Sequence, residues 1–200
     1  MQPYFVPYPG YYRLFKEVDL FVVFDDIQFN SRGFVHRNKI KVNKNISWFT
    51  LPMQKYKKPI LINQLKFDKK SEQFKKFNNF VNELSKEKEL QFIINDLINF
   101  NLEPLDYLIQ LNKKITQKLK ISKQMILSSE FKNSHLSGEK RIIDICKNLN
   151  AKKYINLPSG RNLYNEDNFL KENLQIEFLQ EYEGSKISIL NYLCSKSFIL

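Results

Sequence analysis

The chain has 200 residues, 42% of them hydrophobic and 14% aromatic, which is enough for one folded domain with a full core. Its net charge of +11 admits anionic partners: nucleic acid, a membrane surface or a phosphorylated small molecule. No apolar run approaches the ~20 residues that span a bilayer, and the N-terminus lacks a signal-peptide pattern, so we expect a cytoplasmic protein without a membrane span.

Two elements are predicted before the first polar loop. Residues 11–18 are compatible with two helical turns after Gly10, and residues 20–24 form a continuous apolar run. Such a run, ending here in Asp25 and Asp26, is typical of a strand covered on both faces, as in a parallel sheet. The chain therefore begins with a turn, a helix, a buried strand and a polar loop.

A hairpin, a further strand and a helical block are predicted next. Residues 37–42 and 46–51 flank an Asn-Lys-Asn turn, and residues 60–67 have the composition of a strand. Apolar residues at spacings of three and four then predict helices across residues 71–120, with Pro104 suited to a helix start. We expect this block to contribute core rather than chemistry.

The last part of the chain alternates between strands and helices. Strands are predicted at residues 124–128, 153–157 and 176–179, and helices at residues 137–149 and 168–173. This order indicates right-handed crossovers between parallel strands.

Together these elements predict an α/β fold, with a Rossmann-like mostly parallel sheet, a β-hairpin excursion and a helical insertion. We expect a single domain over residues 1–200, with the insertion at about 71–120.

Cysteines and histidines indicate no redox or metal chemistry. Cys146 and Cys194 lie in apolar helical patterns and are expected to be buried free thiols without a disulfide. His36 and His135 have no second ligand at metal-binding spacing. We therefore predict no metal site and no cofactor.

Polar segments follow several of the predicted strands. In an open parallel sheet, ligands bind outside the carboxyl ends of the strands. Those ends are expected at residues 4–11, 25–32, 128–129 and 158–161. We predict that these segments converge on one site.

Asp26 is the favoured catalytic candidate, with Gln28 beside it. Because neighbouring strand residues point to opposite faces, only one of Asp25 and Asp26 is expected to face a ligand. Asp26 would act as a general base or as an anchor for a substrate hydroxyl. A structural ion pair of this carboxylate with Arg32 or Arg37 is the alternative.

The candidate substrate-binding residues are arginines and amides for phosphate or sugar hydroxyls, aromatics for stacking, and serines and glycines at strand ends. They are Gln2, Tyr4, Tyr8, Gly10, Tyr11, Arg32, Arg37, Asn38, Ser128, Ser129, Ser159 and Gly160. Core packing, hairpin hydrogen bonds and turn capping are the corresponding structural alternatives. Arg141, in an amphipathic helix pattern, is interpreted as a surface charge.

Lysine rather than arginine supplies most of the positive charge, in a chain also rich in Asn and Ile. Scattered lysines favour compositional drift over a nucleic-acid groove, which usually shows arginine and clustered aromatics. We therefore expect no dedicated nucleic-acid partner.

The turn Tyr8-Pro-Gly-Tyr11 resembles, loosely, the nucleotide-binding turn of the nucleotidylyltransferase and pantothenate synthetase superfamily, in which His-x-Gly-His opens a helix. The resemblance implies a nucleotide phosphate at the helix N-terminus. Tyrosines at the places of the imidazoles favour binding over adenylyl transfer.

Several longer segments carry a second resemblance. They are Gln2-Pro-Tyr-Phe-Val-Pro-Tyr-Pro-Gly-Tyr11, Val18-Asp-Leu-Phe-Val-Val-Phe-Asp-Asp-Ile-Gln-Phe29, Arg37-Asn-Lys-Ile40, Trp48-Phe-Thr-Leu-Pro52, Ser128-Ser-Glu130, Glu139-Lys-Arg-Ile-Ile-Asp-Ile-Cys-Lys147, residues 154–164 and residues 187–190. In these the chain is similar to the WbqC-like family of bacterial polysaccharide-cluster proteins. Members usually carry a few apolar residues before Gln2, so the first strand is expected to be shortened.

The second resemblance implies a transferase of surface-polysaccharide (O-antigen or capsule) or nucleotide-sugar biosynthesis. Such an enzyme would transfer an acyl, aminoacyl or glycosyl group to or from an activated sugar, and its partner would be a nucleotide sugar or another phosphorylated small molecule. Two alternatives stay open: a non-catalytic nucleotide- or sugar-binding protein that retains the fold, and a polyanion-binding protein.

Overall fold

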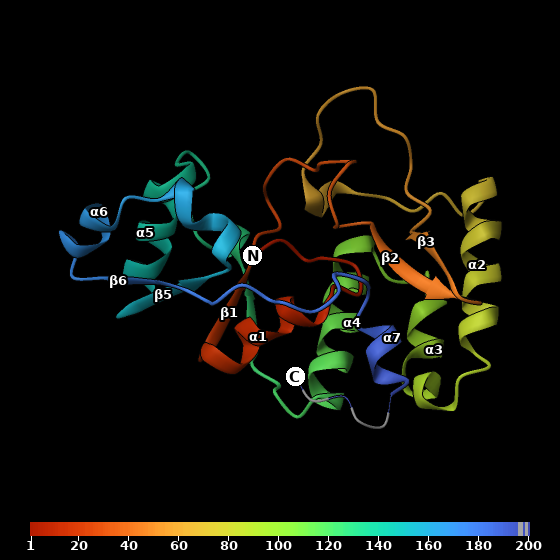
Figure 1. The fold of residues 1–200 in the computed structure, drawn as a ribbon. Helices are drawn as coiled ribbons and strands as arrows, with labels where there is room; N and C mark the ends of the chain where they lie inside the picture. Colours follow the sequence, from red (N-terminus) through yellow and green to blue (C-terminus); the bar gives the residue numbers. More distant parts are fainter. Residues whose placement is uncertain (196–197, 199) are drawn as a thin grey trace.

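The computed structural model describes residues 1–195, 198 and 200 and contains both helices and strands (Figure 1). The helices are α1 (Pro9–Glu17), α2 (Glu72–Leu84), α3 (Gln91–Leu97), α4 (Pro104–Lys118), α5 (Gly138–Asn148), α6 (Glu166–Leu170) and α7 (Leu190–Leu193). The strands are β1 (Leu20–Val23), β2 (Arg37–Val42), β3 (Asn45–Thr50), β4 (Gln124–Leu127), β5 (Lys153–Asn156) and β6 (Gln175–Phe178).

The strands of the described residues form three two-stranded sheets rather than the single Rossmann-like sheet that we predicted. β1 pairs with β4 and β5 with β6, both in parallel, whereas β2 and β3 are antiparallel. The α/β class therefore holds only in the coarse sense of helices combined with small parallel sheets.

A cavity separates the two parallel sheets. It has a volume of about 620 Å³ and is lined by apolar side chains of β1, β5 and α5, together with the charged residues Glu17, Asp19, Lys152 and Lys153. Met1 gives β1 a single residue of further pairing, because its nitrogen donates to Val22 O (2.7 Å) and its carbonyl accepts from Phe24 N (2.8 Å). The chain leaves this edge after Met1, so no strand of the described residues connects β1 with β5.

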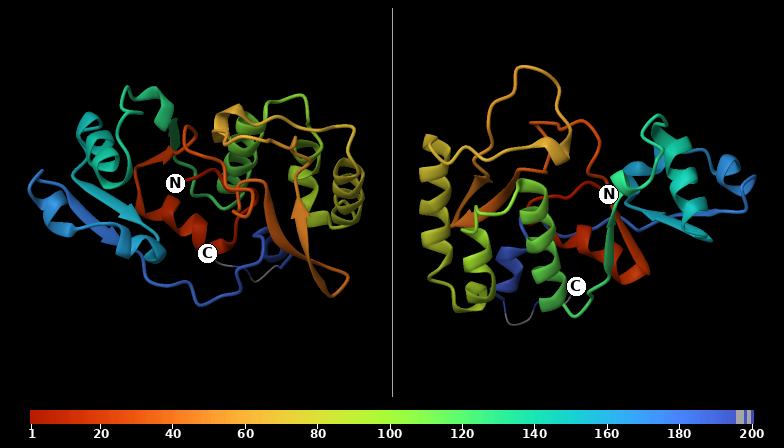
Figure 2. Two further views of the ribbon diagram at one scale, coloured as in Figure 1. Left: turned by 90° about the horizontal axis from the view of Figure 1, so that it is seen from above. Right: turned by 180° about the vertical axis from the view of Figure 1, so that it is seen from behind.

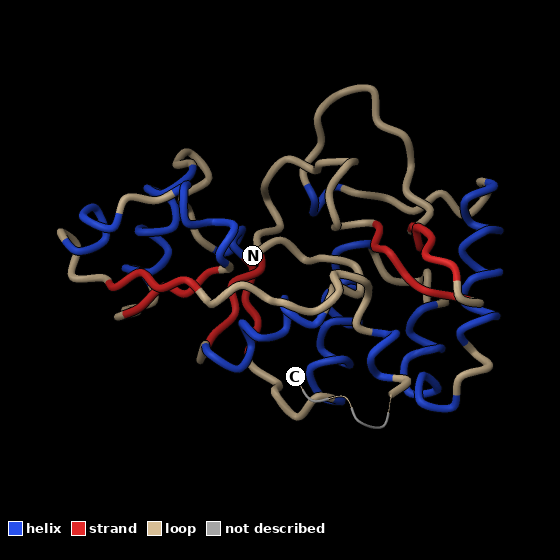
Figure 3. The backbone as a smooth tube through the Cα atoms, in the orientation of Figure 1, coloured by secondary structure: helices blue, strands red, loops and turns tan. Residues whose placement is uncertain are grey.

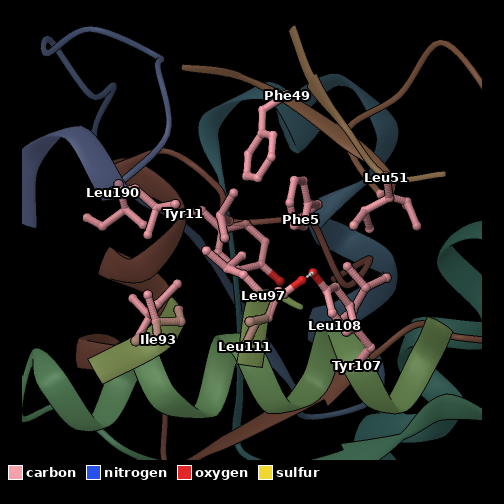
Figure 4. Close-up of a cluster of buried hydrophobic side chains, with 14 of the residues drawn as sticks. Phe5, Tyr11, Phe49, Leu51, Ile93, Leu97, Tyr107, Leu108, Leu111 and Leu190 are labelled. Atoms are coloured by element: carbon pink, nitrogen blue, oxygen red, sulfur yellow. Dashed lines mark hydrogen bonds between the residues drawn. The ribbon is translucent and has the colours of Figure 1, made fainter. Parts of the chain in front are cut away.

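The predicted helical block is confirmed as α2, α3 and α4. Ser71 caps α2 by accepting a hydrogen bond from Phe74 N, and α4 begins at Pro104. The apolar faces of these helices pack against Phe5 and Phe49 (Figure 4). The ring centroids of Phe49 and Phe77 are 4.7 Å apart, so aromatic stacking contributes to this core.

The predicted hairpin is also confirmed, as β2 and β3. Asn43 and Lys44 at its turn both have positive φ values of 49° and 67°, as the twist of a two-residue hairpin requires. The strand predicted at residues 60–67 is wrong. Ile62 N and Asn63 N instead donate to Ile27 O and Asp25 O, and the segment forms a 3-10 turn beside the loop that follows β1.

A second, smaller hydrophobic cluster lies at the other end of the molecule, among α5, α6 and β6 (Figure 1). Its buried members are Ile142, Cys146, Phe169 and Leu174. Cys146 is a buried free thiol, as expected, while the free thiol Cys194 is only half-buried. Long loops connect β1 to β2 and β3 to α2, and the second loop contains the short 3-10 turn Ile62–Gln64 (Figure 3).

No helix in the part of the chain that the structure describes combines the length and apolar character that crossing a membrane requires.

Candidate functional site

Polar side chains gather where β1 and β4 end. Asp25 and Asp26 follow β1, and Ser128 follows β4 directly. Because the two strands are parallel and in register from Leu20 and Gln124 onward, their carboxyl ends lie side by side. The structure thus brings two of the predicted site segments together.

Asp25 is locked into the fold. Its side chain is 1% exposed, and its carboxylate accepts hydrogen bonds from Ser129 N (3.0 Å) and Asn63 Nδ2 (3.1 Å). Its backbone nitrogen donates to Ser128 Oγ (3.2 Å). Asp25 therefore holds the loops after β1 and β4 together and has a structural role.

Asp26 forms a buried ion pair. Its Oδ2 lies 2.5 Å from Nη2 of Arg141, and its Oδ1 accepts from Ser128 Oγ at 2.5 Å. The Ser128 hydroxyl also lies 3.1 Å from Asp25 Oδ1, but its single proton is best placed for the shorter contact. Although burial alone would raise it, the pKa of Asp26 is lowered by hydrogen bonds from Arg141 and Ser128 and by the charge of Arg141.

Arg141 is not the surface charge that the sequence suggested. It is 5% exposed, and its Nε donates to Asn133 Oδ1 at 3.1 Å. Asn133 in turn donates to Asp144 Oδ2 at 2.7 Å, which fixes the amide orientation. One signal could have identified Arg141: it lies four residues before Ile145, on the buried face of α5.

One nitrogen of the Arg141 guanidinium, Nη1, makes no hydrogen bond within the described residues. Nη1 is also not among the completely buried side-chain atoms without a partner in that part of the chain, where Nδ1 of His36 is the one such atom. The site therefore has one guanidinium nitrogen without a hydrogen bond to the described residues, beside an ionised carboxylate.

The turn at Tyr8 to Tyr11 is arranged differently from our expectation. α1 does begin there, but a Cβ on Gly10 would lie 2.8 Å from Cβ of Tyr182 and against the ring of Tyr8. Tyr11 is 1% exposed and donates to Gln2 O at 2.9 Å, and burial raises its pKa. Gly10 thus makes room for tyrosine side chains, where we had expected an open approach for phosphate.

Other predicted residues lie near this turn. Tyr4 packs its ring 5.4 Å from that of Tyr11. Tyr8, Gly10 and Ser159 line a cavity of only about 40 Å³, which has room for little more than a water molecule. A Cβ on Gly160 would lie 2.7 Å from Asn156 Nδ2, so this glycine also serves close packing.

The predicted residues of the β1–β2 connection do not join the Asp26 cluster through any hydrogen bond of the described residues. Arg37 donates to Arg32 O (2.8 Å) and Gly33 O (3.4 Å), and Gln28 is exposed and bridges the backbone of Leu61. The ion pair of Asp26 is thus with Arg141, not with either arginine of this connection. Asn38 is buried inside the hairpin.

His36 gives a pH-dependent prediction. Burial, reinforced by the neighbouring Arg37, lowers its pKa to about 4, and its Nδ1 is buried without a partner. The unfolded chain binds this proton near the ordinary pKa of about 6.5, so the free energy of unfolding should fall as pH drops from about 6.5 towards 4, by about 3 kcal/mol. Urea titrations of His36→Gln should show a shallower fall, whereas exposed His135→Gln should match the wild type; equal slopes for all three would contradict the assignment.

The chain is similar to known proteins over most of its length. The model of a family described as the WbqC-like protein family matches residues 2–186. The uncharacterized protein Rv1507c of Mycobacterium tuberculosis is 37% identical over 54 residues, which are 27% of this chain and 23% of that protein. The match thus spans less than a quarter of that relative's length. No solved structure matches significantly.

Proposed function

The chain belongs to the WbqC-like protein family, and from that premise we propose that it is a transferase of surface-polysaccharide or nucleotide-sugar biosynthesis. Family membership fits a role in polysaccharide-associated biosynthesis.

The Asp26–Arg141 pair carries the proposal. Because its pKa is lowered, Asp26 is ionised at neutral pH and is a weak general base, but it is a strong hydrogen-bond acceptor for a sugar hydroxyl. Nη1 of Arg141, which has no hydrogen bond to the described residues, suits a phosphate oxygen of an activated donor. We therefore assign Asp26 as a hydroxyl anchor, one of the two roles expected from the sequence. We assign Arg141 as a phosphate contact, a role that the sequence had not suggested.

The cavity between the parallel sheets adjoins this pair. Phe24 lies at the boundary: its ring lines the cavity, and the Arg141 guanidinium carbon is 5.5 Å from its centroid. The volume of about 620 Å³ falls within the range of small-molecule sites, and the lining includes Ile142 and Cys146. The apolar part of this lining suits an acyl group better than a second sugar, so acyl or aminoacyl transfer is favoured over glycosyl transfer.

Thermal stabilisation by ligands tests the proposal. Nucleotide sugars and acyl donors would be screened by differential scanning fluorimetry, and at least one should raise the Tm of the wild type. Asp26→Asn should lose most of that ligand-induced shift, because an amide cannot replace the carboxylate charge, whereas exposed Asp106→Asn should keep it. Failure of every ligand to stabilise the wild type would count against the proposal.

If a ligand stabilises the protein, product analysis distinguishes a transferase from a non-catalytic binding protein. A transferase should convert an identified ligand when the matching acceptor or donor is added. Binding without turnover would favour the non-catalytic nucleotide- or sugar-binding protein.

A further inference from the structure

The net positive charge of this chain is concentrated in one segment, although lysines occur along the whole sequence. Residues 27–67 contain nine lysines and arginines and no acidic residue, so they supply nine of the eleven units of net charge. This segment comprises the β2–β3 hairpin and the loops on either side of it. Compositional drift does not explain the absence of acidic residues from one stretch.

The hairpin divides its residues between two faces. Asn38, Ile40 and Phe49 are 2%, 0% and 0% exposed and point into the core. The opposite face carries the cross-strand pairs Lys39–Trp48 and Lys41–Ile46, with Arg37 opposite Thr50. We call these six residues the outer hairpin face.

Cations and apolar side chains are interleaved on the outer hairpin face. Trp48 is 41% exposed and Ile46 59% exposed. The guanidinium carbon of Arg37 lies 4.3 Å, and Nζ of Lys39 lies 5.6 Å, from the centroid of the Trp48 ring. The neighbouring Phe34 is also exposed, with its ring 6.3 Å from that of Trp48.

The cations of this face are available to a partner. Within the described residues, none of Arg37, Lys39 and Lys41 forms an ion pair with a carboxylate. Glu83 lies near the hairpin turn, where Asn43 contacts it, but it is paired with Lys86 at 2.7 Å. In the left view of Figure 2, the turn of the hairpin extends beyond the neighbouring helices and loops. A flat partner can therefore approach this end of the hairpin.

We propose that the outer hairpin face docks on an anionic lipid bilayer, with the lysines at the level of the lipid phosphates and Trp48 and Ile46 at the boundary of the acyl chains. Tryptophan suits this boundary because it is apolar with one polar handle, and lysines are attracted by anionic headgroups. The exposed Ile46 distinguishes a bilayer from nucleic acid, since an aliphatic side chain gains from acyl chains but cannot stack on bases. This role goes beyond the proposed transferase activity and does not depend on it.

Trp48 is the only tryptophan of the chain, so its fluorescence reports directly on the outer hairpin face. Vesicles of phosphatidylcholine mixed with phosphatidylglycerol should shift its emission to shorter wavelength and protect it from iodide quenching. Pure phosphatidylcholine vesicles should do neither. An unchanged emission with the anionic vesicles, or an equal change with both kinds, would overturn the proposal.

Vesicle sedimentation locates the binding face. Lys39→Gln combined with Lys41→Gln should weaken binding about 25-fold, because each basic residue near an anionic surface contributes roughly fivefold. Lys57→Gln with Lys58→Gln removes the same charge from the exposed β3–α2 loop and should weaken binding about twofold at most. Equal losses for the two pairs would show that no specific face docks.

Two further experiments distinguish apolar insertion into the bilayer, and binding of nucleic acid, from attraction by charge alone. Ile46→Ser should weaken vesicle binding several-fold at unchanged net charge, and circular dichroism should be unaltered because the side chain points to solvent. No loss in Ile46→Ser would overturn the insertion. Tight binding of a single-stranded oligonucleotide together with no binding of anionic vesicles would replace the lipid partner by nucleic acid.

Discussion

Replacing Arg141 by methionine is expected to lower the free energy of unfolding by about 3–5 kcal/mol, because it leaves a buried carboxylate without its counter-charge. The side chains of Arg141 and Asp26 are only 5% and 9% exposed. The change also removes the donors to Asn133 Oδ1 and Ser128 O. Urea unfolding monitored by circular dichroism measures the loss.

The control for this variant is Arg32→Met. Arg32 is exposed, so the same exchange should change the free energy of unfolding by about 0.5 kcal/mol or less. In Arg141→Met combined with Asp26→Asn no unpaired charge remains, and the total loss should be smaller than the sum of the single losses. A loss in Arg141→Met no larger than in Arg32→Met would contradict the buried ion pair.

The same pair predicts a pH dependence. The pKa of Asp26 is lower in the folded than in the unfolded chain, so its contribution to stability is present above the unfolded value of about 4 and is lost as pH falls through the folded value. The difference in stability between wild type and Arg141→Met should therefore shrink below about pH 4.

Local patterns in the sequence predicted most of the helices and strands, because a helix or a hairpin depends on neighbouring residues. The helical spacing of Phe77, Val81 and Leu84 is the buried face of α2, and the Asn-Lys-Asn turn does join β2 to β3. The strand predicted at residues 60–67 was wrong because the structure of this segment depends on residues that are distant in the sequence. Its backbone hydrogen bonds go to the loop after β1, some 35 residues earlier, and no local pattern encodes that pairing.

The candidate site was predictable only in part. The polar ends of two apolar runs placed the two aspartates and Ser128 together, because parallel strands end at one edge. The partners of Asp25 and Asp26 were not predicted. Asn63 and Arg141 reach the aspartates from sequence separations of 38 and 115 residues, and an isolated arginine in an amphipathic helix pattern resembles a solvated one.

Asn38 was predicted to bind substrate, and the structure gives it a different position. It is 2% exposed, and its Nδ2 donates to Val6 O (2.9 Å) and Phe5 O (3.3 Å). Val6 has a φ of 36°, a conformation that costs a β-branched residue roughly 1–3 kcal/mol and persists only where neighbouring contacts hold it. Ser188 Oγ donates to the same carbonyl at 2.8 Å. Asn38 therefore clamps the N-terminal segment onto the hairpin.

Asn38→Ala is accordingly expected to lower the free energy of unfolding by about 2–4 kcal/mol, since two buried carbonyls lose a donor and a small cavity remains. Asn45→Ala, at an exposed position of the same hairpin, should cost no more than about 0.5 kcal/mol in the same urea titration. Ser188→Ala should couple to Asn38→Ala, because both side chains hold Val6 O. If Asn38 instead contacts substrate, Asn38→Ala would abolish the ligand-induced rise in Tm at unchanged stability, the reverse of what the clamp requires.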